Sequence, residues 1–167
     1  MQVRDAMNPE VVHIGPDATL SELERLLLAE RLGGVPVVTR GQLVGVVSRS
    51  DILRALGTER AIAEAQADVY REFYDDPFAP SEHAAREDEE QSEAIEQQIA
   101  ARMALLHVRD AMTPEVVAVA AETPLREAAA TMAARRIHRL LVTDAGRLVG
   151  ILSALDVVRL VGDGRLV

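Results

Sequence analysis

The sequence predicts an α/β (α+β) protein: two tandem β-α-β-β-α lobes related by pseudo-two-fold symmetry, with an inserted helical hairpin. Three observations lead to this fold class. The phrase VRDAMNPEVV, which starts at Val3, returns with one change as VRDAMTPEVV at Val108. The same order of apolar and amphipathic segments follows each phrase, as in an internal repeat. The stretch between the copies, residues 58–107, belongs to neither of them.

The strands of each copy are predicted from three short apolar runs. The first run covers 11–14 in copy one and 116–119 in copy two. The other two runs of each copy are separated by a glycine, Gly41 or Gly146, as a short β-hairpin requires. We therefore expect one hairpin and one further strand in each lobe.

The helices of each copy are predicted from amphipathic stretches with recognisable starts. Thr19 and Glu22 have the spacing of a capping box. Thr123 followed by Pro124 predicts an N-cap with proline at the first helical position. A second helical pattern follows each hairpin. Because lobes of this size bury little surface alone, we expect the two to pack together.

The insert differs from both copies in composition. It carries the acidic excess that gives the chain its formal net charge of −9, and its aromatic residues all lie within 70–78. We predict that the helix starting near Asp51 continues into the insert, and that a second helix covers 87–107 after a break at Pro77 and Pro80. Two interpretations stay open: a solvated helical hairpin, or a contact surface for a second copy or a partner protein.

Bulk composition narrows the class of function. The predicted domains are lobe one at 1–57, an acidic helical insert at 58–107 and lobe two at 108–167. The negative net charge opposes nucleic-acid binding, which needs clustered basic residues. The chain has no cysteine, no apolar run long enough to span a membrane and no signal-peptide pattern. We therefore expect a cytoplasmic protein without membrane insertion.

The motif that points to chemistry follows the second hairpin strand of each copy. Copy one has GVVSRSD, ending at Asp51, and copy two has GILSALD, ending at Asp156. A serine followed three residues later by aspartate at a helix start is an ordinary capping arrangement. The shared glycine, the hydroxyl at a helix N-terminus and a carboxylate able to accept ribose hydroxyls also fit a nucleotide site.

No pattern of catalytic residues accompanies this motif. The sequence shows no nucleophile–base pair, no cluster of metal ligands and no P-loop, so we predict no catalytic residue, no metal site and no enzymatic activity. His13 stands in an apolar run without a second ligand nearby, and His83 and His107 flank the insert. We interpret these histidines as partly exposed or solvated side chains.

Together, the motifs resemble the CBS domain pair, also called the Bateman module. The resemblance rests on V-x-D-A-M-x-P-x-V-V, on the hairpin with PVV at Pro36, and on G-h-h-S-x-x-D, where h is apolar. It covers both copies but not the insert. It implies lobes packed sheet to sheet, frequent dimerisation, and two clefts that bind AMP, ADP, ATP or S-adenosylmethionine to regulate an attached or partner protein.

The resemblance implies that each cleft combines the Ser-x-x-Asp motif of one lobe with parts of the other lobe. For cleft A it implies Ser48, Ser50, Asp51, Thr113, Val117, Ile137, His138, Arg139 and Leu141. The aspartate of this set would hold the ribose, the two serines and the arginine would hold the phosphate, and the valine and isoleucine would lie against the adenine. Leu141 stands where the family usually has proline.

For cleft B the resemblance implies Asn8, Val12, Leu32, Gly33, Gly34, Pro36, Ser153 and Asp156. The two clefts differ in charge, because glycines stand in lobe one where lobe two has His138 and Arg139. Leu155 also replaces the hydroxyl of Ser50. We therefore predict that cleft A binds a phosphorylated nucleotide, and that cleft B is weak, empty or suited to an uncharged adenosyl group.

The predicted function is a non-catalytic, adenine-nucleotide-sensing regulatory module. It requires no cofactor, takes AMP, ADP, ATP or S-adenosylmethionine as its regulatory ligand, and forms a homodimer. Because the sequence opens two residues before copy one and ends soon after copy two, we expect regulation in trans of an unknown protein target. The alternative is a ligand-free dimerisation or interaction scaffold that uses the acidic aromatic insert.

Overall fold

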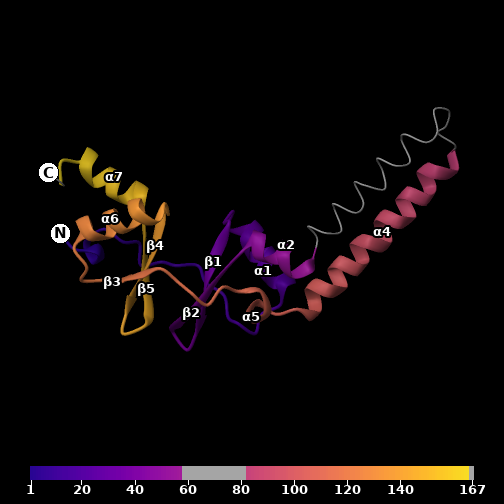
Figure 1. The fold of residues 1–167 in the computed structure, drawn as a ribbon, viewed down its shortest axis with the longest axis horizontal. Helices are drawn as coiled ribbons and strands as arrows, with labels where there is room; N and C mark the ends of the chain where they lie inside the picture. The colour runs from indigo at the N-terminus through magenta and orange to yellow at the C-terminus, as the bar shows by residue number, and fades with distance from the viewer. Residues whose placement is uncertain (58–81, 166–167) are drawn as a thin grey trace. The chain divides into compact units, whose positions relative to one another are not determined.

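The computed structural model describes residues 1–57 and 82–165 (Figure 1). The described residues form a mixed α+β fold with a five-stranded sheet, which confirms the predicted fold class. In chain order the elements are the 3-10 helix η1 (Val3–Asp5), α1 (Leu20–Ala29), β1 (Gly34–Thr39), β2 (Gln42–Ser48), α2 (Arg49–Leu56), α4 (Glu82–Leu105), α5 (Val108–Ala111), β3 (Ala118–Ala120), α6 (Leu125–Arg135), β4 (Arg139–Asp144), β5 (Arg147–Ser153) and α7 (Ala154–Gly162).

The chain divides into two compact units that mix the two sequence copies. The sheet unit comprises Met1–Pro16, Val35–Val47 and Thr113–Val167, and the helical unit comprises Asp17–Gly34 and Ser48–Met112. The sheet unit therefore contains the hairpins of both copies with α6 and α7, whereas the helical unit contains α1, α2, α4 and α5. The domain boundaries at 57 and 107 stay predictions.

The two hairpins meet at their turns in the sheet unit. The strand order is β1-β2-β5-β4-β3, and β2 pairs with β5 through Gln42 and Arg147. Both turns use a glycine at positive φ, 81° at Gly41 and 80° at Gly146, a conformation that glycine adopts without steric cost. The carbonyl of each glycine accepts a backbone hydrogen bond from the other hairpin, at 3.1 Å and 3.0 Å. The hairpin predictions are confirmed, and the turns obey the expected pseudo-two-fold relation.

The first apolar run forms a strand in copy two only. There β3 runs parallel to β4, with Val119 opposite Val142. In copy one, Ile14 makes a single parallel bridge to Val37, so the strand predicted over 11–14 is wrong. Pro16 follows closely after Ile14 and has no N–H to donate, which stops the ladder at this point.

The leading segments, which we define as residues 3–7 and 108–112, are exchanged between the copies. Val3 of copy one donates a backbone hydrogen bond to Thr123 of copy two at 2.9 Å, and Val108 of copy two donates to Ala18 of copy one at 2.8 Å. Both valine side chains are fully buried. Burying a valine contributes about 1.5–3 kcal/mol. The repeated phrase therefore anchors each copy to the helices of the other.

An ion pair accompanies each exchanged segment. In the sheet unit Arg4 bonds to Glu122 at 2.5 Å, and in the helical unit Arg109 bonds to Asp17. The aspartate of each phrase accepts a hydrogen bond from the backbone N–H three residues earlier, at 2.8 Å for Asp5 and 2.9 Å for the copy-two aspartate. The arginine and the aspartate of VRDAM thus have a structural role in both units.

The start of α1 agrees with the sequence-based prediction, whereas the start of α6 and the end of α2 differ from it. The capping box of Thr19 and Glu22 is present, with hydrogen bonds of 2.8 Å and 3.2 Å. Helix α6 starts one residue later than predicted, with Pro124 at the N-cap, because the carbonyl of Thr123 instead accepts the bond from the other copy's leading segment. Helix α2 ends at Leu56, since Gly57 adopts a left-handed φ of 69°.

The core of the sheet unit lies between the sheet and the helices α6 and α7, which cover one face of β4 and β5 (Figure 1). Its members are aliphatic, as the composition predicts: Val3, Ala121, Leu125, Ala128, Met132, Leu140, Val142, Leu152 and Leu160. In the helical unit, α1 buries Leu20, Leu23 and Leu27. This packing fixes the helix starts that carry the Ser-x-x-Asp motifs.

Helix α4 packs against α1 and α2 in the helical unit. Met103 is buried, and Arg102 donates to the carbonyl of Ala55 at the end of α2 at 3.3 Å. The sequence predicts a helix over 87–107 here, and α4 covers Glu82–Leu105. The helical continuation after Gly57, the two prolines and the aromatic stretch lie outside the described residues. No helix in the described part of the chain is long and apolar enough to cross a membrane.

Candidate functional site

The first Ser-x-x-Asp motif lies at the start of α2 in the helical unit. Ser48 donates two hydrogen bonds to Oδ2 of Asp51, from its backbone N–H at 2.8 Å and from its hydroxyl at 2.6 Å. The guanidinium of Arg54, one turn further along the helix, donates to Oδ1 at 2.7 Å. Both oxygens of a nearly buried carboxylate therefore accept hydrogen bonds from the same helix end.

The environment of Asp51 favours its ionised form. Burial acts first and would raise the pKa, but the hydrogen bonds from Ser48 and Arg54 together outweigh it, so the pKa of Asp51 lies below the ordinary aspartate value. At neutral pH the side chain is thus a carboxylate that only accepts hydrogen bonds. A group of this kind can bind hydroxyl or cationic donors, and it cannot act as a proton donor.

The second motif repeats the cap at the start of α7 in the sheet unit. Ser153 donates to Oδ2 of Asp156 from its backbone N–H at 2.8 Å and from its hydroxyl at 2.5 Å, and Asp156 returns a backbone bond to the serine at 3.2 Å. Arg159 lies 4.0 Å from Oδ1, beyond hydrogen-bond distance. The carboxylate side chain is 27% exposed, against 9% for Asp51.

Arg54 and Arg159 are the residues that the sequence analysis missed. They stand at equivalent places, three residues after each aspartate, so the repeated pattern is Ser-x-x-Asp-x-x-Arg. Residues three apart on a helix lie on one face, which brings the arginine back to the carboxylate. The signal in the sequence is an arginine at the same position in both copies.

Most residues assigned to cleft A outside α2 lie in the sheet unit. Thr113 is exposed, and its backbone pairs with that of Val46 through two hydrogen bonds of 2.9 Å, close to where β2 ends at Ser48. Val117 and Ile137 are partly buried against the unit's core, and Leu141 is buried. The exposed hydroxyl of Ser50 lies in the helical unit on α2.

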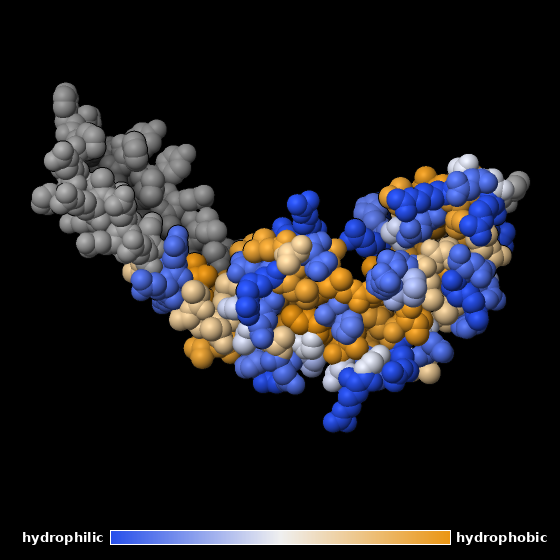
Figure 2. All heavy atoms as spheres, turned by 180° about the vertical axis from the view of Figure 1, so that it is seen from behind, coloured by the Kyte–Doolittle hydropathy of each residue, from blue (hydrophilic) through white to orange (hydrophobic). Residues whose placement is uncertain are grey.

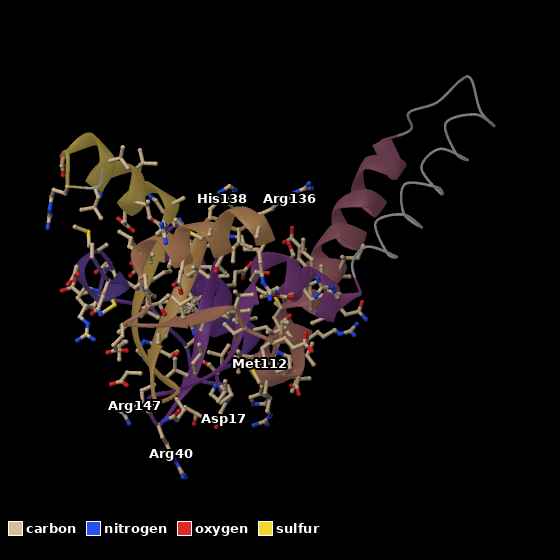
Figure 3. All side chains as sticks on the ribbon, turned by 60° about the vertical axis from the view of Figure 1, so that its left-hand side comes forward. Asp17, Arg40, Met112, Arg136, His138 and Arg147 are labelled. Carbon is tan, nitrogen blue, oxygen red and sulfur yellow. The ribbon has the colours of Figure 1, made fainter. Side chains whose placement is uncertain are left out.

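His138, which precedes β4, and Arg139, the first residue of β4, form an exposed basic pair. The carbonyl of His138 accepts a bond from Ala154 at 2.9 Å, and Arg139 lies opposite Ser153 in the β4–β5 register. Figure 3 shows the side chains of His138 and Arg136 projecting outward on the same side of the ribbon. Within the sheet unit, this basic pair therefore lies beside Ser153, the N-cap of α7. Ser153 is one of the residues that the resemblance implies for cleft B.

The residues assigned to cleft B are also divided between the units. In the sheet unit, Asn8 pairs with Ile151 through backbone bonds of 2.8 Å and 2.9 Å, Val12 is exposed, and Pro36 is buried. In the helical unit, Leu32 donates a backbone bond to α1, and the carbonyl of Gly33 accepts one from Arg49 at 3.1 Å. Gly34 is the first residue of β1.

Packing explains why glycine stands at position 150, in the second G-h-h-S-x-x-D motif. A Cβ at Gly150 would lie 2.6 Å from Sδ of Met7 and 3.1 Å from the carbonyl oxygen of Asn8. From the sequence, the shared glycine indicates a close backbone approach that suits a ligand. In the sheet unit the approaching group is the chain's own leading segment. The glycine is therefore weaker support for a nucleotide site than the sequence alone indicates.

The comparisons with known proteins agree with this fold. The sequence pattern of the CBS domain matches residues 3–58 and 108–163. The chain belongs to the CBS domain family. Among solved members of this family, CBSX2 of Arabidopsis thaliana in complex with AMP is 26% identical, with a TM-score of 0.63 over 97% of each chain.

Two further relatives have similar lengths. The CBS domain of a CBS domain-containing membrane protein from Sphaerobacter thermophilus is 28% identical, with a TM-score of 0.65 over 96% of this chain and 87% of that one. The protein MJ1426 of Methanocaldococcus jannaschii is 28% identical over 160 residues, which is 95% of this chain and 89% of MJ1426.

Proposed function

We propose that this CBS pair is a non-catalytic regulatory module that binds an adenosine-containing ligand: AMP, ADP, ATP or S-adenosylmethionine. One observation carries the proposal. Both sequence copies match the CBS domain, and the whole chain is similar to a CBS pair that was solved with AMP. The Ser-x-x-Asp geometry supports it, because an ionised carboxylate beside a serine hydroxyl suits the hydroxyls of a ribose.

In the proposed arrangement Asp51 accepts hydrogen bonds from the ribose, and Ser50 binds the phosphate. The phosphate role that the resemblance implies for Ser48 does not fit, because its hydroxyl proton is donated to Oδ2 of Asp51. The exposed positions of Ser50 and Arg139 leave their polar groups available to a ligand. Asp156 and its serine form the second, weaker cleft. The proposed domains remain 1–57, 58–107 and 108–167, and the proposed location is the cytoplasm, in keeping with a chain that has no cysteine.

The deciding experiment is a calorimetric and thermal-unfolding screen with AMP, ADP, ATP and S-adenosylmethionine. A ligand present at 100 times its Kd should stabilise the native chain by about 2.7 kcal/mol. Asp51→Asn should abolish the stronger binding, and Asp156→Asn is the matched control in the other copy. If no compound binds, the proposal is overturned, and the ligand-free scaffold becomes the better description.

We propose further that the module forms a homodimer and acts on a partner protein in trans. The apolar side chains of Leu155, Val158 and Val161 on α7 are each more than half exposed. Figure 2 shows apolar atoms between polar ones at the end of the molecule where the C-terminus lies. A second copy would remove this surface from water. Light scattering of the wild type and of Val158→Asp tests the dimer, which the substitution should dissociate.

A further inference from the structure

Arg54 donates a hydrogen bond to the Asp51 carboxylate, the group that would bind the ribose of the proposed ligand. A carboxylate offers about four acceptor positions, two on each oxygen. Oδ2 of Asp51 already accepts both bonds from Ser48, and Oδ1 accepts the bond from Arg54. A ribose diol brings two hydroxyl donors, and only one position on Oδ1 remains. Both hydroxyls can therefore bind this carboxylate only if Arg54 leaves it.

Arg54 is well placed to leave. Its side chain is 66% exposed, so water can replace the carboxylate as its partner, whereas the Asp51 side chain is 9% exposed. The bonds from Ser48 come from the backbone and from a short side chain at the helix start, and they stay when the arginine moves. Exchange of the arginine for a hydroxyl donor thus keeps the buried carboxylate satisfied.

Copy two shows the same sequence pattern with the arginine at ion-pair distance and no hydrogen bond to the carboxylate. Arg159 lies 4.0 Å from Oδ1 of Asp156, while the two serine bonds are retained. The cap of the helix therefore does not depend on the arginine. The two copies present a closed and an open form of one Ser-x-x-Asp-x-x-Arg motif.

We propose that Arg54 is a specificity-determining latch on Asp51, which a ligand with a vicinal diol must displace in order to bind through both hydroxyls. The latch rests on the proposed function and deepens it. It lowers the affinity of the copy-one carboxylate for ribose ligands. A 2′-deoxy ligand needs a single acceptor position on Oδ1, so it can bind without displacing the arginine. Arg54 is thus a positioning residue that acts through Asp51.

The test compares AMP and 2′-deoxy-AMP by calorimetry on the wild type and Arg54→Met. The latch predicts that Arg54→Met binds AMP roughly two- to fivefold more tightly, the range that corresponds to the loss of an exposed ion pair, and changes 2′-deoxy-AMP less than twofold. Simple electrostatics predicts the opposite sign, because the substitution removes a cation. Weaker AMP binding, or equal tightening of both nucleotides, would overturn the latch.

Two matched variants and one ligand-free measurement complete the design. Arg54→Lys keeps the cation and should stay near the wild-type affinity, and Arg159→Met should leave it unchanged. Carbon-detected NMR of the Asp51 carboxyl should show its pKa rising in Arg54→Met without ligand, because the stabilising cation is gone. An unchanged titration would overturn the latch. A raised pKa with no nucleotide binding to any variant would establish the ion pair but overturn both the proposed function and the competition.

Discussion

The sheet unit and the helical unit are assembled from exchanged parts. In the sheet unit, Val3 of copy one is buried among the helices of copy two, and in the helical unit, Val108 of copy two is buried with the helices of copy one. The units differ in that both hairpins belong to the sheet unit. A sequence copy is therefore not a packing unit. A fragment that ends at residue 57 would lack Val108, which is buried with the helices of copy one.

The two motifs differ in a second way, although their caps are the same. Both serines donate two bonds to their aspartates, but the third partner is close in copy one and distant in copy two. The difference coincides with burial, because the carboxylate of copy one is the more enclosed. Local sequence determines the cap, and the surroundings determine whether the arginine completes it.

The largest expected effect tests the exchanged packing. Gly150→Ala should lower the free energy of unfolding by about 1–3 kcal/mol, because the new methyl group would overlap Met7 and approach the Asn8 carbonyl. Gly15→Ala is the control, since no atom lies within 4 Å of its Cβ position. Urea unfolding measures both. An equal response of the two variants would show that the leading segment does not pack against β5.

A smaller effect sharpens the comparison of the two carboxylates. Asp51→Asn should cost about 1–2 kcal/mol at neutral pH, because a buried acceptor for Ser48 and Arg54 is lost. The folded pKa of Asp51 is lowered, so its stabilisation is complete above the ordinary aspartate pKa and disappears as the pH falls through the lower folded value.

Urea unfolding of wild type and variant between neutral and acidic pH should therefore show their difference shrinking at low pH. Asp156→Asn should cost less at neutral pH, because its carboxylate is more exposed. A larger loss for the copy-two variant would reverse the ranking of the two motifs. A pH-independent loss for Asp51→Asn would show that its charge does not contribute to stability.

The smallest effect concerns the ion pairs of the leading segments. A double-mutant cycle on Arg4 and Glu122 should give a coupling of about 0.2–1 kcal/mol, as for other exposed pairs, and added salt should reduce it. The equivalent cycle on Arg109 and Asp17 should give a similar value. A coupling present in one unit and absent in the other would break the pseudo-two-fold relation at this position.

The sequence predicted the helices and strands better than it predicted which segments they pair with. The glycine turns and the Thr19 capping box could be recognised because they depend on residues close together in the chain. The later start of α6 depends on a backbone bond to a distant segment, whereas the strand at Ile14 is cut short by Pro16, two residues further along the chain. For the candidate site, the serine–aspartate caps could be predicted, whereas the distance of each arginine from its carboxylate could not.

The repeat, the family and the local motifs can be recognised from the sequence alone, because periodic apolar residues, turn glycines and helix caps act over a few neighbouring positions. Three features are visible only in the folded chain: the copy that each leading segment packs against, the close approach of Met7 to Gly150, and the hydrogen bond from Arg54 to Oδ1 of Asp51. The physical reason is that burial and long-range hydrogen bonds depend on residues far apart in the chain. Identical phrases at Val3 and Val108 carry no information about which helices they will contact.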